Sequence, residues 1–197
     1  MRKLGMDELD RKSVNAFRES EKTPIVVVLD NIRSMHNVGS VFRTADAFLI
    51  QAIYLCGYTP QPPHRDIHKT ALGATETVEW KYFASAAEAV RDLRAAGFGV
   101  YAVEQTEGSV PLPEFSALRS QGLSGRFSGP LAVVFGNEVS GVGEEALALC
   151  DGGIEIPQWG MKHSLNISIA AGIVLWELVR TRQEPNNAAD GADKKEL

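Results

Sequence analysis

The chain has 197 residues, 44% of them hydrophobic, which is enough for one packed domain with short appendages and too few for two ordinary domains. Its 20 Lys and Arg residues against 25 Asp and Glu residues give a net charge of -5, which excludes a generally basic nucleic-acid binder but allows a local basic patch. No signal-peptide core opens the chain, and Cys56 and Cys150 form no C-x-x-C pair. We therefore expect a soluble protein of the reducing cytoplasm.

Both ends of the chain differ from its middle. Residues 1–22 alternate charges with spaced apolar residues, which predicts a peripheral helical arm, with a solvated tail as the alternative. Residues 184–197 are rich in Pro, Asn, Asp and Gly, a composition that predicts a disordered tail. The folded domain is expected to span residues 23–183.

Within that domain, apolar strand patterns alternate with helical patterns. Continuous apolar, often β-branched runs predict buried strands at 25–29, 52–56, 99–103, 131–135 and 154–156, and residues 78–83 are also strand-like. Apolar residues at helical spacing predict helices near 38–49, at 86–96 ended by Gly97, and at 164–182. This order predicts an α/β fold on a mostly parallel sheet flanked by helices, with residues 106–129 as a long connection or lid.

In open α/β sheets, ligands bind at the loops that leave the carboxyl ends of the strands. The loop after the first strand contains Asn37, Gly39 and Arg43. Asn37 is expected either to cap the following helix or to take part in a site, and Gly39 allows close backbone approach. Arg43 lies next to Phe42 on an apolar helical pattern, so its charge requires an anionic partner or solvent.

The loop after the strand at 131–135 offers two interpretations. Gly136 permits close passage of a cofactor, and Glu138 could orient a polar group. The segment from Gly141 to Ala146 also fits G-x-G-x-x-A, which would indicate a dinucleotide-dependent oxidoreductase. That pattern belongs directly at a strand end in a first βαβ unit, whereas here it lies five residues beyond the strand and late in the chain.

A third loop leads from the short strand at 154–156 into the last helix. Ser164 is expected to cap that helix, and Asn166 and Ser168 add polar groups to its first turn. Three strand exits rich in glycine or amide side chains in one small chain favour a shared site over three separate structural explanations.

Taken together, the three loops resemble the SpoU, or TrmH-like, branch of the SPOUT-class RNA methyltransferases. The resemblance rests on N-x-G-x-x-x-R, on G-x-E and on I-P followed by S-L-N, here carried by Asn37, Gly39, Arg43, Gly136, Glu138, Ile156, Pro157, Ser164, Leu165 and Asn166. The motifs occur in the family order, and the resemblance covers residues 24–182. The segment ALGA at 71–74 is also similar to the middle section of the family.

The resemblance implies a fold, a cofactor and a reaction. The fold would be a SPOUT-type domain with a deep C-terminal trefoil knot, an exception to unknotted topology. The knot would bind S-adenosylmethionine, and the implied cofactor-binding residues are Val103, Glu104, Gly136, Ile156, Ser164 and Leu165. The reaction would be methyl transfer to a ribose 2'-hydroxyl of structured RNA, with tRNA slightly ahead of rRNA.

The resemblance also assigns catalytic roles and a homodimer. Arg43 matches the catalytic centre, and Asn37, Glu138, Ser164 and Asn166 would orient it and the ribose. A guanidinium normally stays protonated and is a poor base, so Arg43 acts either as a strongly perturbed base or, as we favour, as a clamp for phosphate and developing alkoxide. The family site is completed across a twofold dimer, which makes the last helix the expected contact.

An acidic chain must meet RNA through local basic residues. We expect a phosphate-binding rim at the strand exits, made by Arg33, His36, Arg65, Lys69 and Lys162, with the neighbouring histidines 64, 68 and 163. The histidine spacing does not suit a metal site, so no metal is expected. Two alternatives stay open at this point: a knotted RNA-binding protein without catalysis, and the dinucleotide oxidoreductase.

Overall fold

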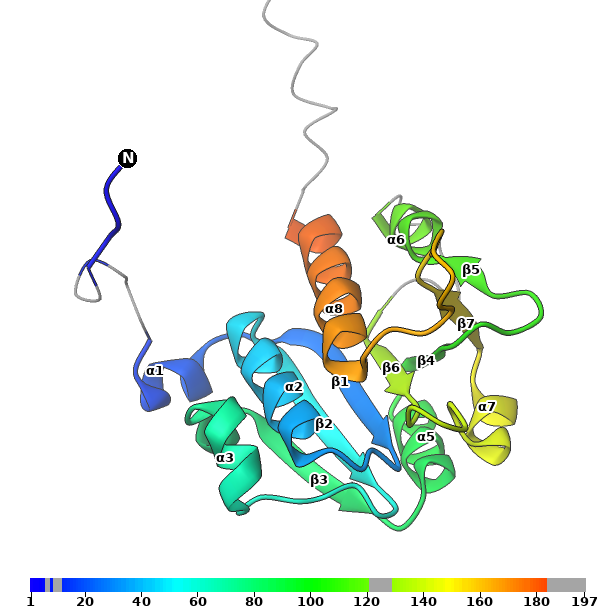
Figure 1. Ribbon diagram of the computed structural model, residues 1–197, viewed down its shortest axis with the longest axis horizontal. Coiled ribbons are helices and arrows are strands. Elements are labelled where there is room, and N and C mark those ends of the chain that lie inside the picture. Colours follow the sequence, from blue (N-terminus) through cyan, green and yellow to red (C-terminus); the bar gives the residue numbers. More distant parts are fainter. Residues whose placement is uncertain (6–7, 9–11, 121–128, 184–197) are drawn as a thin grey trace, which may run out of the picture.

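The computed structural model describes residues 1–5, 8, 12–120 and 129–183 and shows one parallel sheet between two helical layers (Figure 1). In the described part of the chain the sheet has seven strands in the order β3-β2-β1-β6-β4-β7-β5, and every neighbouring pair is parallel. The strands are β1 (Thr23–Asp30), β2 (Ile50–Cys56), β3 (Glu79–Phe83), β4 (Gly99–Val103), β5 (Val110–Pro111), β6 (Leu131–Phe135) and β7 (Gly152–Glu155). The predicted α/β fold on a parallel sheet is confirmed.

The central strands are apolar throughout because both of their faces are buried. Along β1, Val27 and Leu29 belong to the core on one face, while Val26 and Val28 belong to the core on the other. Burial on both faces explains why the central strands read as continuous apolar runs in the sequence.

The helices divide between the two faces of the sheet (Figure 1). One layer contains α2 (Met35–Ala47), α3 (Arg65–Ala71), α4 (Ala74–Thr77), α6 (Leu112–Ser120) and α8 (Ile167–Gln183). The other layer contains α5 (Ala86–Ala95) and α7 (Glu144–Leu149), and α1 (Val14–Glu19) lies beside α4. Within the first layer α8 packs against both α2 and α6.

The parallel arrangement brings the three motif loops to one edge. They leave the carboxyl ends of β1, β6 and β7, which lie close together in the middle of the sheet, with only β4 between β6 and β7. Residues separated by more than 100 positions thereby become neighbours, as a site at the carboxyl edge requires.

Several predicted boundaries need correction. The predicted lid at 106–129 contains β5 and α6, and Leu112 and Phe115 of this helix are buried in the core. The basic residues expected at a strand exit around 65–69 belong to α3, which starts at Arg65 and buries Ile67. The last strand ends at Glu155, and the predicted arm contributes α1, anchored by buried Phe17. The prediction for residues 184–197, like part of the arm, lies outside the described residues.

Two features bear on the expected location. In the part of the chain that the structure describes, no helix combines the length and apolar character needed to cross a membrane. Cys56 and Cys150 are free thiols, and burial raises the pKa of each to about 12.

Candidate active site at the carboxyl edge of the sheet

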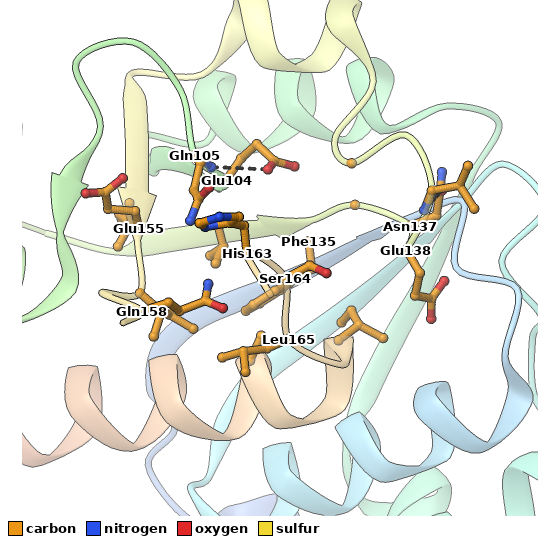
Figure 2. Close-up of a pocket in the computed structure, with 18 residues that line it drawn as sticks. Glu104, Gln105, Phe135, Asn137, Glu138, Glu155, Gln158, His163, Ser164 and Leu165 are labelled. Carbon is orange, nitrogen blue, oxygen red and sulfur yellow. Dashed lines mark hydrogen bonds between the residues drawn. The ribbon is translucent and has the colours of Figure 1, made fainter. Parts of the chain in front are cut away.

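A cavity of about 240 Å³ lies where the motif loops meet (Figure 2). Its walls come from the exits of β4, β6 and β7 and from the start of α8. All six residues predicted to bind the cofactor line it: Val103, Glu104, Gly136, Ile156, Ser164 and Leu165. The third loop closes one side, and His163, Ser164 and Leu165 are drawn around the same space (Figure 2).

The chemistry of this lining fits S-adenosylmethionine. Apolar side chains such as Phe135 and Ile154 offer a surface for an adenine ring, and backbone groups at the strand exits can hydrogen-bond its edge. Three carboxylates, on Glu104, Glu138 and Glu155, line the cavity, whereas no Lys or Arg is found among its described lining residues. A negative lining favours a ligand that carries a sulfonium and an ammonium group.

The same lining argues against a dinucleotide. A pyrophosphate would meet the three carboxylates without a cation to balance it. The glycine turn at 141–143 is also occupied, because the backbone N-H of Gly143 donates to the buried carboxylate of Asp30 at 2.8 Å. A phosphate at this turn would have to displace that carboxylate, so the oxidoreductase interpretation is wrong.

Close backbone packing explains two glycines of the second loop. A side chain at Gly136 would overlap the backbone of Gly141 and Val142. Gly141 has a φ of +67° and approaches the carboxylate of Glu104, whose Oε2 accepts the N-H of Val142 at 3.3 Å. The loop from 136 to 142 is thus folded tightly over the end of β4 and holds Glu104 at the cavity.

A chain of side-chain hydrogen bonds connects the three motifs. Asn37 Nδ2 donates to Glu138 Oε1 at 2.8 Å, and Asn166 Nδ2 donates to Asn37 Oδ1 at 3.2 Å. Asn37 belongs to α2, Glu138 follows β6, and Asn166 precedes α8, so one amide joins residues 101 and 129 positions away. This chain lies at the α2 end of the cavity, where Glu138 projects in Figure 2.

The expected cap at Ser164 is wrong, and of the two alternatives for Asn37 the structure excludes the cap. Ser34, and not Asn37, caps α2 by accepting the N-H of Asn37 at 3.2 Å. Asn166, and not Ser164, caps the last helix, because its Oδ1 accepts the N-H of Ser168 at 2.9 Å. Because Ser34 caps α2, the side-chain amide of Asn37 can bond to Glu138 and Asn166. Ser164, which does not cap α8, lines the cavity.

Arg43 lies on α2 outside the cavity. Its neighbours Val41 and Phe42 are fully buried, but Arg43 itself is exposed, so it does not interrupt the apolar face as its sequence position suggested. Solvent, the second of the two expected environments, surrounds its guanidinium, which makes no hydrogen bond or ion pair with the described residues. A substrate phosphate can therefore reach it without displacing a protein carboxylate.

The predicted RNA-binding residues differ in their surroundings. Arg33 is exposed and lies 5.7 Å from the ring centre of Tyr58, while His36, Arg65 and Lys162 are exposed. Lys69 is partly neutralised by Asp66, at 2.6 Å, and this contact lowers the pKa of Asp66. Among the described residues, the other four predicted side chains have no such carboxylate contact.

Some site residues were missed because their signals lie outside the three motifs. Tyr58 is half exposed, and its N-H donates to Asn31 Oδ1. The N-H of Ile32 donates to Thr59 Oγ1, so the loops that follow β1 and β2 are fixed to each other. Asp30 accepts the N-H of Gly143, but in the sequence it is only the residue that follows an apolar strand. Further cavity residues that the sequence did not single out are Gln105, Phe135, Asn137, Glu155 and Gln158, while His163, expected at the RNA-binding rim, also lines the cavity.

Comparison with known proteins agrees with this geometry. Residues 24–176 match the model of the SpoU rRNA Methylase family. Over 175 residues the chain is 33% identical to a tRNA (guanosine(18)-2'-O)-methyltransferase of Thermus thermophilus, covering 89% of this chain and 84% of that protein.

Two solved structures have the same fold. The TrmH/SpoU tRNA modifying enzyme of A. aeolicus has a TM-score of 0.72 and 26% identity, covering 87% of this chain and 83% of that one. The AdoMet-bound rRNA methyltransferase of Sinorhizobium meliloti has a TM-score of 0.70 and 30% identity, covering 83% and 59%.

Fold, cavity and motif loops together define a parallel-sheet RNA methyltransferase. The chain belongs to the SpoU rRNA Methylase family, and it is an S-adenosylmethionine-dependent enzyme that methylates ribose 2'-hydroxyl groups of RNA.

Proposed function

We propose that this enzyme methylates a structured RNA, with tRNA preferred over rRNA, and that it acts as a homodimer in the cytoplasm. The observation that carries the proposal is the hydrogen-bond chain from Glu138 through Asn37 to Asn166, which joins the cofactor cavity to the helix that bears Arg43. The chain fixes three motif loops relative to one another before substrate binds, and such preorganisation favours catalysis.

Each side chain of this site receives a role from its position. S-adenosylmethionine supplies the electrophilic methyl group. Glu104 and the backbone of Gly136 would bind its polar parts, while Ile156 and Leu165 flank the adenosine. Glu138 and Asn37 would hold the ribose in line with the methyl group, and in-line approach is the geometric requirement of the reaction.

Arg43 would act as the clamp for the substrate. Methyl transfer requires removal of the hydroxyl proton as the new O-C bond forms, so negative charge develops on the ribose oxygen. An exposed guanidinium that no carboxylate of the described residues neutralises can bind the adjacent phosphate and stabilise that charge. This role needs no deprotonated guanidinium.

The exposed surface of α8 supports the homodimer. Ile169, Ile173 and Trp176 are spaced i, i+4 and i+7, lie on one side of the helix, and are 56%, 39% and 55% exposed. An exposed apolar stripe of this kind is typical of an interface. A second copy packed there could bring its own residues to the rim of the cavity, which Arg43 of the same chain does not line.

The preference for tRNA rests on the comparisons. The Thermus thermophilus relative, which is named as a tRNA enzyme, is 33% identical to this chain and is covered over 84% of its length. We further propose that residues 23–183 form the catalytic domain, with residues 1–22 as an arm and residues 184–197 as a tail, and that the C-terminal part is knotted. The cytoplasmic location is supported by the two free thiols.

The proposal is tested by transfer of labelled methyl from S-adenosylmethionine to unmodified tRNA and, separately, to unmodified rRNA. Nuclease digestion then identifies the methylated nucleoside. We expect a 2'-O-methylated nucleoside from the tRNA pool. A product from the rRNA pool alone would contradict the tRNA preference, and a base-methylated product would contradict the ribose chemistry.

A further inference from the structure

A second cavity, of about 510 Å³, lies apart from the cofactor site. It is formed between α3, α4 and the start of the edge strand β3, and it shares no lining residue with the cofactor cavity. Trp80, Pro62, Pro63 and the aliphatic side chain of Ile67 supply its apolar surface. Nothing in the mechanism above uses this cavity.

The apolar part of the lining is rigid. Trp80 is partly buried and packs against the main core, so its indole is held in place. Pro62 and Pro63 are rings whose backbone φ is fixed. Proteins that bind unpaired nucleotides use fixed aromatic surfaces of this kind, because every base has a face that stacks on them.

The polar part of the lining combines one guanidinium and two imidazoles with one carboxylate. Arg65, His64 and His68 line the cavity and are exposed, whereas Glu76 is the one acidic residue among the described lining residues. Arg65 has no hydrogen bond or ion pair with the described part of the chain, unlike Lys69 in the next turn. In a protein of net charge -5, an available guanidinium beside two imidazoles and an indole is complementary to a nucleotide.

The cavity has a fixed relation to the catalytic motif. Thr70 Oγ1 of α3 donates to the carbonyl oxygen of His36 on α2 at 3.0 Å. A side chain at Gly39 would overlap α3 at Ile67 and Thr70, so the glycine lets the two helices touch. One helix, about 10 Å across, therefore separates the cavity from the motif that carries Asn37 and Arg43, a gap that a few nucleotides can span.

We propose that this cavity binds an unpaired nucleotide of the substrate RNA, a few positions from the methylated one. Its base stacks on Trp80 and its phosphate contacts Arg65 and His68. The inference rests on the proposed RNA substrate and adds a subsite that selects RNA with a looped-out residue near the target ribose.

The binding test uses Trp80 as its own reporter. The chain has three tryptophans, and the double substitution Trp159→Phe and Trp176→Phe, at two exposed positions, leaves Trp80 as the sole indole. The probes are a single-stranded RNA pentamer of mixed sequence and an RNA duplex without unpaired residues. We expect the pentamer to quench Trp80 emission saturably, and Arg65→Ala to raise the midpoint about tenfold.

A matched control removes an arginine from the opposite layer. Arg91 of α5 is exposed and paired with Glu145, so Arg91→Ala changes the net charge equally at a distance from the cavity. We expect this variant to bind the pentamer as the parent does. Equal quenching by the duplex, or equal midpoints for the two arginine variants, would overturn the proposal.

Turnover separates this inference from the proposed function. With tRNA as substrate, Arg65→Ala and Trp80→Leu should raise KM about tenfold and leave kcat and S-adenosylmethionine affinity unchanged, while Trp80→Phe keeps a stacking face and the parent KM. Unchanged KM in Arg65→Ala and Trp80→Leu would refute the subsite while methylation continues. Absence of methyl transfer in the parent enzyme would refute the proposed function, and the quenching assay would still decide what the cavity binds.

Discussion

Arg43 and the cofactor cavity are separate in this chain. The guanidinium is exposed on α2, whereas the cavity is lined by the exits of β4, β6 and β7 and the start of α8. Under the proposed roles, cofactor binding and stabilisation of the reacting ribose depend on different side chains, and single substitutions should separate them.

Arg43→Ala should lower kcat about 10²- to 10³-fold and leave S-adenosylmethionine affinity within about twofold, because it removes a contact to substrate and none to cofactor. Single-turnover methylation and calorimetric cofactor titration measure the two effects. Arg43→Lys is the control, because it keeps the charge and loses the planar fork. A matching loss of cofactor affinity would show that Arg43 belongs to the adenosine pocket.

Gly141 is a second residue whose role is specific. Its φ of +67° disfavours any side chain, and a Cβ would press on the carboxylate of Glu104. Gly141→Ala should destabilise the fold by about 1–2 kcal/mol and weaken S-adenosylmethionine binding about tenfold. Thermal unfolding with and without cofactor measures both.

Gly160 provides the control for Gly141, because it lies in the third loop and a Cβ there meets no atom within 4 Å. Gly160→Ala should retain stability and cofactor affinity. Similar losses of stability and cofactor affinity in both variants would mean that any added side chain in these loops weakens binding, and that the contact with Glu104 is not the cause.

At the scale of elements, α6 and α8 are joined by a carboxylate. Glu177 of α8 accepts from Ser116 Oγ at 2.7 Å and pairs with Arg180 at 2.9 Å. The Arg180 contact, followed by that of Ser116, lowers the pKa of Glu177 below its ordinary value near 4.5. A depressed folded-state pKa contributes stability that is present above the unfolded pKa and is lost as the pH falls through the folded value.

Glu177→Gln should therefore lower stability at pH 7 by about 1 kcal/mol and show a smaller further loss on acidification below about pH 4.5 than the parent. Denaturant unfolding at pH 7, 5 and 3.5 measures the free energy of unfolding of parent and variant at each pH. Ser116→Ala, which leaves the ion pair with Arg180, should give an intermediate pH dependence. Parallel acid profiles for parent and Glu177→Gln would exclude this contribution.

At the scale of the whole molecule, the apolar stripe of α8 is the surface on which the proposed homodimer rests. Trp176 also packs against Phe48 of the same chain, with ring centres 5.9 Å apart, so the stripe is continuous with the contact between α8 and α2. A second copy would cover a surface that is otherwise unfavourable in water.

Ile173→Asp should weaken the dimer by a factor of about 100 or more, because it places a charge at the centre of an apolar contact. Sedimentation equilibrium measures the effect, and methylation should fall with it if the second copy completes the site. Leu72→Asp is the control, since Leu72 is 64% exposed and lies at the end of α3, away from α8. A parent protein that sediments as a monomer would contradict the proposed interface.

The sequence by itself determined the parallel sheet and the edge at which the motif loops meet. Central strands such as β4 and β6 were placed at their observed ends, because a strand buried on both faces must be a continuous apolar run. The motif loops were recognised because close backbone approach, as at Gly136, restricts which residue can occupy a position.

Only the tertiary structure decided the contacts across elements. The caps of α2 and α8 are Ser34 and Asn166 because α2 begins at Met35 and α8 at Ile167. The side chain of Asn37 instead bonds to Glu138 and Asn166 on distant elements, contacts that local propensity does not contain. Helix α6 was missed because its buried residues face a core made by distant strands and α8. The Trp80 cavity has the same origin, since it joins α3 to an edge strand through packing that depends on the whole sheet.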